Sequence, residues 1–66
     1  QQGLGRALLQ AVLEELIPMA ERDRCPIYLH AQVQALPFYT QLGFVTDGDE
    51  FEEADIAHYR CLYQGR

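Results

Sequence analysis

The chain has 66 residues, of which 48% are hydrophobic, and its formal net charge is −5 at pH 7. This length allows one small domain, and the hydrophobic content is that of a folded protein rather than a disordered one. The acidic balance argues against nucleic acid as the main partner. No run of about 18 apolar residues and no basic leader occur in the sequence, so we expect neither a membrane span nor secretion.

The two cysteines, Cys25 and Cys61, are too few and too widely spaced for a disulfide framework. We expect free, buried thiols in a reducing compartment, and therefore a cytoplasmic protein. The two histidines, His30 and His58, do not combine with the cysteines in the spacings typical of zinc ligands, so we expect no metal site. Serine and lysine are absent, which excludes a serine nucleophile and a Schiff-base lysine.

The first predicted element is an amphipathic helix from residue 4 to about residue 20. We expect its buried stripe to consist of apolar residues that recur every four positions and of the small or apolar residues beside them: Leu4, Ala7, Leu8, Ala11, Val12, Leu16 and Met19. Arg6, Gln10 and Glu14 would form the solvated stripe. Pro18 is expected to kink the last turn or to begin the exit from the helix, because it lacks an N–H group.

The rest of the chain alternates between strand and helix patterns. Residues 26–31 alternate as a strand, with Ile27, Leu29 and Ala31 on one face and Tyr28 and His30 on the other. A short helix is predicted over residues 34–42, followed by a strand at 44–46, a turn at 47–50 and a strand at 58–63. The order helix, strand, helix, strand, strand indicates a mixed α/β (α+β) fold.

Two glycines at the start of the first helix indicate an anion site. Gly3 and Gly5 allow a tight turn and close approach of the backbone, and the first N–H groups of a helix have no internal partner. The helix dipole adds a favourable field for negative charge. The pattern predicts a phosphate or pyrophosphate site, with the glycine-rich start of a helix without a ligand as the alternative.

Two segments, GLGRALL at residues 3–9 and FYTQLGF at residues 38–44, together resemble the GCN5-related N-acetyltransferase (GNAT) superfamily. The first is similar to that family's acetyl-CoA pyrophosphate loop, and the second to its later helix, which ends in Tyr-x-x-x-Gly-Phe. The segments LHAQ at 29–32 and EEADIAH at 52–58 resemble the ElaA-type branch. The resemblance extends over residues 1–66 but matches only the C-terminal half of the family's domain, so we expect the N-terminal half to lie outside this chain.

The resemblance implies acetyl-CoA as co-substrate, no metal, and acetyl transfer by direct attack of a small-molecule or peptide amine on the thioester. It assigns pyrophosphate binding to five residues near the start of the chain: Gln2, Gly3, Gly5, Arg6 and Ala7. Tyr39 has the position of the general acid that protonates the departing thiolate, and its alternative role is to close the core beside Phe38. Gln32 stands where many members have an asparagine that contacts the CoA arm, and it could equally be a helix-start residue without a ligand.

Two further features leave alternatives open. His30 could relay a proton from the amine, because an imidazole titrates near neutral pH, or it could be structural. The acidic run over residues 47–55 is either a solvated hairpin or a rim that attracts a cationic amine. Other possible functions are a non-catalytic CoA-binding or regulatory module and a small acidic interaction domain. An open strand edge would permit a homodimer.

Overall fold

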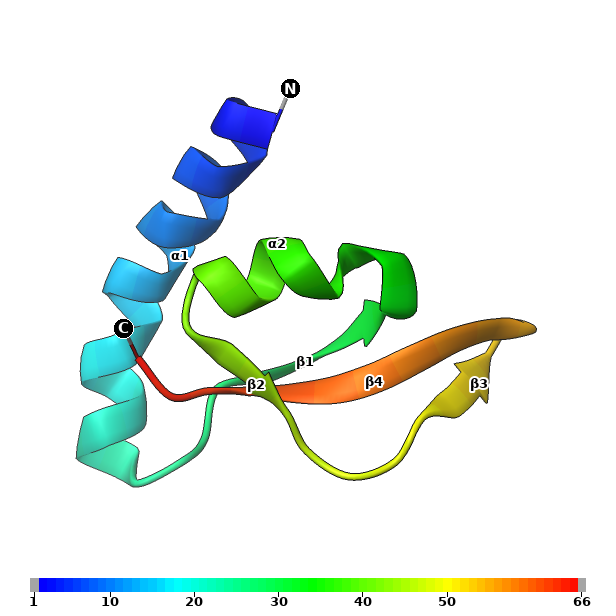
Figure 1. The fold of residues 1–66 in the computed structure, drawn as a ribbon. Coiled ribbons are helices and arrows are strands. Elements are labelled where there is room, and N and C mark those ends of the chain that lie inside the picture. The colour runs from blue at the N-terminus through cyan, green and yellow to red at the C-terminus, as the bar shows by residue number, and fades with distance from the viewer. Residues whose placement is uncertain (1, 66) are drawn as a thin grey trace.

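The computed structural model describes residues 2–65 and shows two helices beside a four-stranded antiparallel sheet (Figure 1). In chain order the elements are helix α1 (Gln2–Asp23), strand β1 (Tyr28–Gln32), the 3₁₀ turn η1 (Val33–Ala35), helix α2 (Leu36–Gln41), and strands β2 (Phe44–Thr46), β3 (Phe51–Glu53) and β4 (Ile56–Tyr63). The predicted mixed fold is confirmed, and β3 is a strand that the sequence analysis missed.

Helix α1 is longer than predicted at both ends. It includes Gly3 at its start and continues through Pro18 to Asp23, so residues 21–23 are helical rather than a connector. Pro18 is exposed, and the carbonyl that loses its helical partner can therefore bond water. The helix ends where Arg24 adopts a left-handed φ of 57°, and the N–H of Cys25 donates to the carbonyl of Ala20 at 3.0 Å. This closing bond is the Schellman pattern.

The predicted buried face of α1 is wrong. The side chains expected inside are exposed, with exposed fractions from 38% to 62%: Leu4, Leu8, Val12, Leu16 and Met19. The helix instead packs through Leu9, Leu13 and Ile17, of which Leu13 is buried. Both sets recur every three or four residues, because α1 is apolar on two sides, and periodicity alone does not choose between them. We call the exposed set the outer stripe.

Strand β4 is the centre of the sheet. It pairs with β1 on one side, and with β2 and β3 on the other, always antiparallel. Within residues 2–65, β1 pairs with no other strand, so its second edge is open. The register places Leu29 opposite Cys61 and His30 opposite Arg60. Since residues directly opposite share a face, these pairs define two different faces of the sheet.

One face of the sheet carries the core. Ala31, Phe44 and Cys61 are buried there together with Leu13 of α1 and Leu42, which follows α2. The predicted alternation of β1 is confirmed, because Ile27, Leu29 and Ala31 face this core. The other face, which we call the open face, carries the buried His58 and otherwise exposed or half-buried side chains, among them Tyr28, His30, Val45, Arg60 and Leu62.

The second helix and the strand after it agree with the prediction, although the first turn is 3₁₀. Gly43 ends the segment with a φ of 103°, in the region that favours glycine. A Cβ at this position would lie 2.8 Å from the carbonyl oxygen of Gly65 and 3.0 Å from the ring of Tyr63. The N–H of Gln64 donates to the carbonyl of Gly43 at 2.8 Å. Glycine is therefore required here both for its backbone conformation and for space.

Strands β3 and β4 form a hairpin, and β3 and the turn belong to the acidic run. Glu53 pairs with Ile56, so only Ala54 and Asp55 form the turn, with left-handed φ values of 54° and 65°. Two consecutive left-handed residues are the geometry of a type I′ hairpin turn. The sequence analysis allowed a solvated hairpin over residues 47–55 but placed its turn at 47–50, because the usual marker, Asn-Gly or Asp-Gly, is absent from residues 54–55.

The cysteine prediction is half right. Cys61 is buried in the core as expected, whereas Cys25 is exposed just after α1. Both are free thiols. Neither helix described in residues 2–65 has the length and apolar character needed to cross a bilayer.

Candidate functional site

The first turn of α1 presents an open backbone. Gly3 and Gly5 lie in helix rather than in a loop, and a Cβ added to either would meet no other atom within 4 Å. The first turn contains no acidic residue. Its N–H groups stand at the positive end of a 22-residue helix, and Gly3 and Arg6 line the same small hollow. These features fit a pyrophosphate. Ala7 is exposed one position further on, and the side chain of Gln2 lies outside the described part of the chain.

The two segments that carry the resemblance meet in space. Nη2 of Arg6 donates to Oε1 of Gln41 at 3.4 Å, which links the first turns of α1 to the last residue of α2. A hollow of about 200 Å³ lies between the two helices, lined by Gly3, Arg6, Phe38 and Gln41. The candidate anion site therefore borders the helix that carries Tyr39.

Tyr39 is half-buried and held by aromatic rings. Its ring makes edge-to-face contacts with Phe38 at 5.2 Å and Phe44 at 5.9 Å between centroids. Such contacts fix a ring while leaving its hydroxyl free to serve a polar partner. The position is compatible both with the core role and with the general-acid role.

Gln32 ends β1 and directly precedes η1. Its Oε1 accepts a hydrogen bond from Nε2 of Gln34 at 3.0 Å. The amide nitrogen of Gln32 remains as the donor that a ligand would use.

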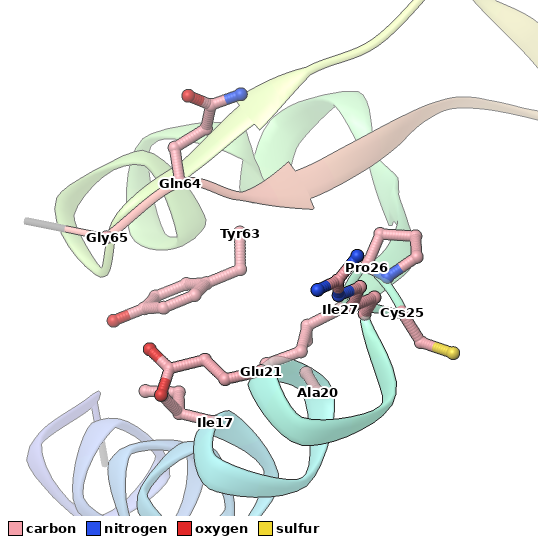
Figure 2. A pocket seen from close by; sticks show the side chains of 10 residues that line it. Ile17, Ala20, Glu21, Cys25, Pro26, Ile27, Tyr63, Gln64 and Gly65 are labelled. Carbon is pink, nitrogen blue, oxygen red and sulfur yellow. The ribbon is translucent and has the colours of Figure 1, made fainter.

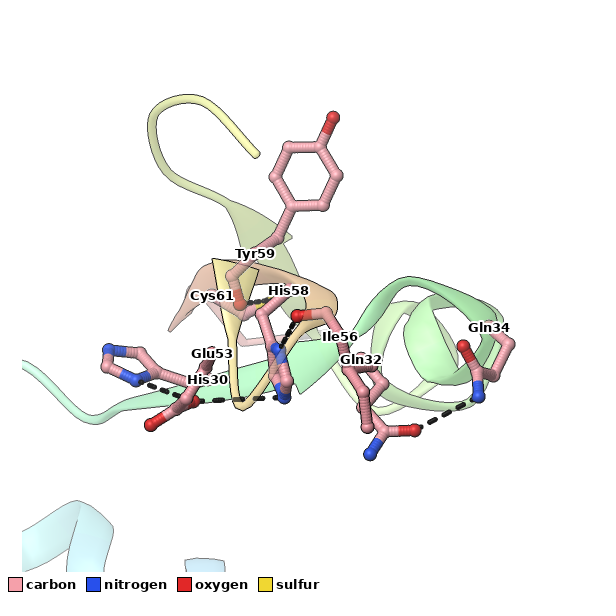
Figure 3. A network of polar contacts seen from close by, with 8 residues as sticks. All are labelled: His30, Gln32, Gln34, Glu53, Ile56, His58, Tyr59 and Cys61. Carbon is pink, nitrogen blue, oxygen red and sulfur yellow. Dashed lines mark hydrogen bonds and ion pairs between the residues drawn. The ribbon is translucent and has the colours of Figure 1, made fainter. Parts of the chain in front are cut away.

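His30 belongs to a polar cluster on the open face (Figure 3). Its Nδ1 lies 3.7 Å from Oε1 of Glu53, and Nε2 of His58 lies 3.7 Å from the same oxygen. His58 is buried, and its Nδ1 lies 2.7 Å from the carbonyl oxygen of Ile56. The sequence analysis singled out His30 but missed this use of Glu53 and His58. Side chains alternate along β3 and β4, so the sequence can place Glu53 and His58 on one face. Only the pairing of strands brings these two residues to His30.

No group of three metal-binding side chains that could hold an ion occurs within residues 2–65. The acidic run is mostly exposed, and two of its members have charged or titratable partners. Asp47 Oδ2 lies 3.4 Å from Nε of Arg60, and Glu53 lies between the two histidines.

A second hollow lies at the other end of α1 (Figure 2). It measures about 660 Å³ and is lined by the last turns of α1, the segment after it and the end of β4: Ile17, Ala20, Glu21, Arg24, Cys25, Pro26, Ile27, Tyr63, Gln64 and Gly65. Ile17 is the lining residue nearest to Gly3 along α1, and the 14 positions that separate them span about 21 Å at about 1.5 Å each. This hollow is therefore not part of the candidate pyrophosphate site.

Comparison with known proteins identifies the family. A family model described as an acetyltransferase (GNAT) domain matches residues 1–61. The chain is also similar to a crystal structure of an acyl-CoA N-acyltransferase from Pseudomonas aeruginosa, with 34% sequence identity and a TM-score of 0.74. That match covers 96% of this chain and 41% of the solved chain, so this chain spans less than half of its relative's length. The comparison with curated proteins gave no match. The chain belongs to the GNAT acetyltransferase family, and its fold corresponds to part of the acyl-CoA N-acyltransferase fold.

Proposed function

We propose that this chain is part of an N-acetyltransferase that binds acetyl-CoA and transfers its acetyl group to an amine. The observation that supports this most directly is the contact between Arg6 and Gln41. It brings the glycine-rich start of α1 beside Phe38 and Gln41 of α2, the helix that also carries the candidate proton donor Tyr39. Family membership makes acyl-CoA the natural ligand of that arrangement.

In this proposal the backbone N–H groups of the first turn of α1 hold the pyrophosphate, and Arg6 adds a charge-assisted hydrogen bond. The residues assigned to this task are Gln2, Gly3, Gly5, Arg6 and Ala7. Gln32 offers its amide nitrogen to the CoA arm. The amine attacks the thioester directly, and Tyr39 protonates the departing thiolate. The protein contributes mainly by positioning the two reactants, and no covalent intermediate and no metal is needed.

Several finer features are also proposals. We assign the chain to the ElaA-type branch because of the segments at 29–32 and 52–58. The acceptor is a small-molecule or peptide amine, the location is cytoplasmic, and neither nucleic acid nor membrane is a partner. The open edge of β1 permits a homodimer. A monomeric mass in solution would contradict the dimer.

One experiment tests the proposed transfer and also the two alternative functions. The complete natural protein is incubated with acetyl-CoA and a panel of primary amines, while free thiol and acetylated amine are measured together. We expect both products in equal amounts. CoA binding without transfer to any amine would favour a non-catalytic module. A folded protein that does not bind CoA would favour the small acidic interaction domain.

A further inference from the structure

Glu53 lies between two imidazoles on the open face of the sheet. Its Oε1 is 3.7 Å from Nδ1 of His30 on β1 and 3.7 Å from Nε2 of His58 on β4 (Figure 3). These distances are too long for hydrogen bonds but short enough for ionic attraction. Glu53 and His30 are exposed, whereas His58 is buried. A ligand approaching this face would therefore meet the carboxylate and His30 first.

The hydrogen bond of His58 determines which of its nitrogens carries a proton. A carbonyl oxygen only accepts, so Nδ1 must donate to Ile56 across the 2.7 Å that separate them. In the neutral ring, Nε2 then directs a lone pair toward the Glu53 carboxylate. Two hydrogen-bond acceptors, Nε2 of His58 and the Glu53 carboxylate, therefore face and repel each other. A positive charge placed beside them would offset this repulsion.

The charged groups around the cluster do not supply that positive charge. Arg60 lies opposite His30, but its Nε lies 3.4 Å from Asp47 and its guanidinium lies over the Tyr28 ring at 5.1 Å. The charged neighbours of Glu53 on the hairpin are acidic: Glu52 and Asp55.

An aromatic side chain completes the cluster. The Phe51 ring stands edge-on to His30 at 5.0 Å and stacks on His58 at 5.9 Å between centroids. A carboxylate beside aromatic rings is a combination that favours an organic ammonium ion, because the rings add cation–π attraction and cover the apolar part. The cluster thus offers a counter-ion, a base and an apolar contact on one face.

We propose that Glu53, His30 and His58 form the acceptor site for a protonated amine, in which Glu53 binds the ammonium group and His30 takes its proton. This inference rests on the proposed acetyl transfer and specifies its acceptor as a cationic primary amine. With Nδ1 of His30 directed at the carboxylate, Nε2 is the nitrogen that accepts the proton. His58 is a positioning residue that acts through Glu53.

The proposed step balances. One proton passes from the ammonium group to His30, which leaves a neutral amine with a free electron pair. That pair forms the C–N bond to the acetyl carbon while the C–S bond breaks, and the sulfur keeps the bonding electrons. The second amine proton ends on the departing thiolate. The products are an N-acetyl amine, CoA thiol and one proton on His30, which is released to solvent.

Binding is tested with butylamine, which is protonated at pH 7, and with 1-butanol as its neutral isostere. Ring-proton NMR signals of His30 and His58 are followed in the complete natural protein during titration. We expect shifts with butylammonium and none with 1-butanol. Glu53→Gln should weaken butylammonium binding about tenfold, because a charge-assisted contact is lost. Equal responses to the two probes would overturn the proposal.

Glu52→Gln is the matched control, since Glu52 is the neighbouring carboxylate on the opposite face of β3. It should leave butylammonium binding within about twofold, as expected for a surface charge outside the site. If Glu52→Gln and Glu53→Gln weaken binding equally, the effect is that of general negative charge and the proposed site is overturned. Glu53 is exposed, so its variant is expected to fold, and a retained dispersed spectrum verifies this.

Kinetic measurements test the acceptor site and the proposed transferase activity independently. With butylamine as acceptor, Glu53→Gln should raise KM for the amine but not for acetyl-CoA, and His30→Gln should remove the low-pH limb of the kcat/KM profile. Acetylation with an unchanged amine KM and an unchanged pH profile would overturn the acceptor site and leave the transferase proposal standing. Glu53-dependent butylammonium binding without any acetyl transfer would support the cation site and contradict the transferase.

Discussion

Nη2 of Arg6 donates a hydrogen bond to Oε1 of Gln41 at 3.4 Å, across 35 positions of the sequence. The bond joins a residue at the positive end of α1 to the end of α2. Because Gln41 carries no charge, the Arg6 guanidinium keeps its full positive charge while its direction is restricted. A preorganised charge beside open backbone N–H groups is what an anion site requires.

Removing the Arg6 charge should weaken CoA binding. We expect Arg6→Ala to lower affinity about tenfold, as for loss of one charge-assisted hydrogen bond, measured by calorimetry with CoA. Gln41→Ala is the control, because it removes the restraint on Arg6 but not the charge. It should lower the affinity for CoA by less than about threefold. Equal losses in the two variants would show that the guanidinium does not contact the ligand.

Tyr39→Phe should lower kcat without abolishing transfer. An ordinary phenol is a weaker acid than an ordinary thiol by an amount worth about 2 kcal/mol, and a thiolate leaves without much help. We expect a loss within the range of about 10²–10⁴ typical of general acid catalysis, with KM for acetyl-CoA unchanged. Tyr59→Phe, at another half-buried tyrosine of the core, is the control. No change in kcat would leave Tyr39 as a core residue only.

Gly43→Ala should destabilise the fold by at least about 2 kcal/mol in denaturant unfolding, since it combines left-handed strain with a collision against Gly65. Gly48→Ala separates the two causes. Gly48 also has a positive φ, of 89°, but no atom lies within 4 Å of its Cβ position. Gly48→Ala should lower the free energy of unfolding by about 1 kcal/mol, from strain alone. Equal costs at the two glycines would mean that the contact with Gly65 yields without penalty.

Ala54→Gly should stabilise the protein by about 0.5 kcal/mol, because an alanine held at a φ of 54° carries strain that glycine avoids. The same exchange at Ala57 is a control inside β4, where glycine should instead cost about 0.5–1 kcal/mol. Thermal and denaturant unfolding of the two variants would measure both signs. Destabilisation by Ala54→Gly would show that the turn is not strained in solution.

Stability should fall in alkaline solution through Cys61. Burial raises the pKa of the Cys61 thiol above its ordinary value of 9.0. The unfolded chain then releases this proton at a lower pH than the folded one, so stability present below pH 9.0 is lost as pH rises toward the folded pKa. The slope cannot exceed about 1.4 kcal/mol per pH unit for one group.

Comparing wild type with Cys61→Ala in denaturant at pH 8 and above pH 9 isolates this thiol from the tyrosines. We expect the variant to lose less stability over that interval. Cys25→Ala, at the exposed thiol, should behave as wild type. An identical alkaline loss in Cys61→Ala would assign the effect to other groups.

The elements that agreed with prediction are those determined by neighbours in sequence. The alternation of Ile27, Leu29 and Ala31 identified β1, and Gly43 marked the end of α2. These patterns act through the periodicity of one strand or the conformational freedom of one residue, so they can be read without knowing the rest of the fold. The two motif segments identified the family in the same way.

Tertiary structure decided the features that need a distant partner. Helix α1 offers two apolar stripes, and only packing selected Leu13 over Leu8 for the core. The hairpin of β3 had no glycine marker, and its pairing with β4 gave it a place in the sheet. That pairing also carried Glu53 to His30 and His58, and packing carried Arg6 to Gln41. Contacts between distant segments depend on the global arrangement of strands and helices, which local periodicity does not encode.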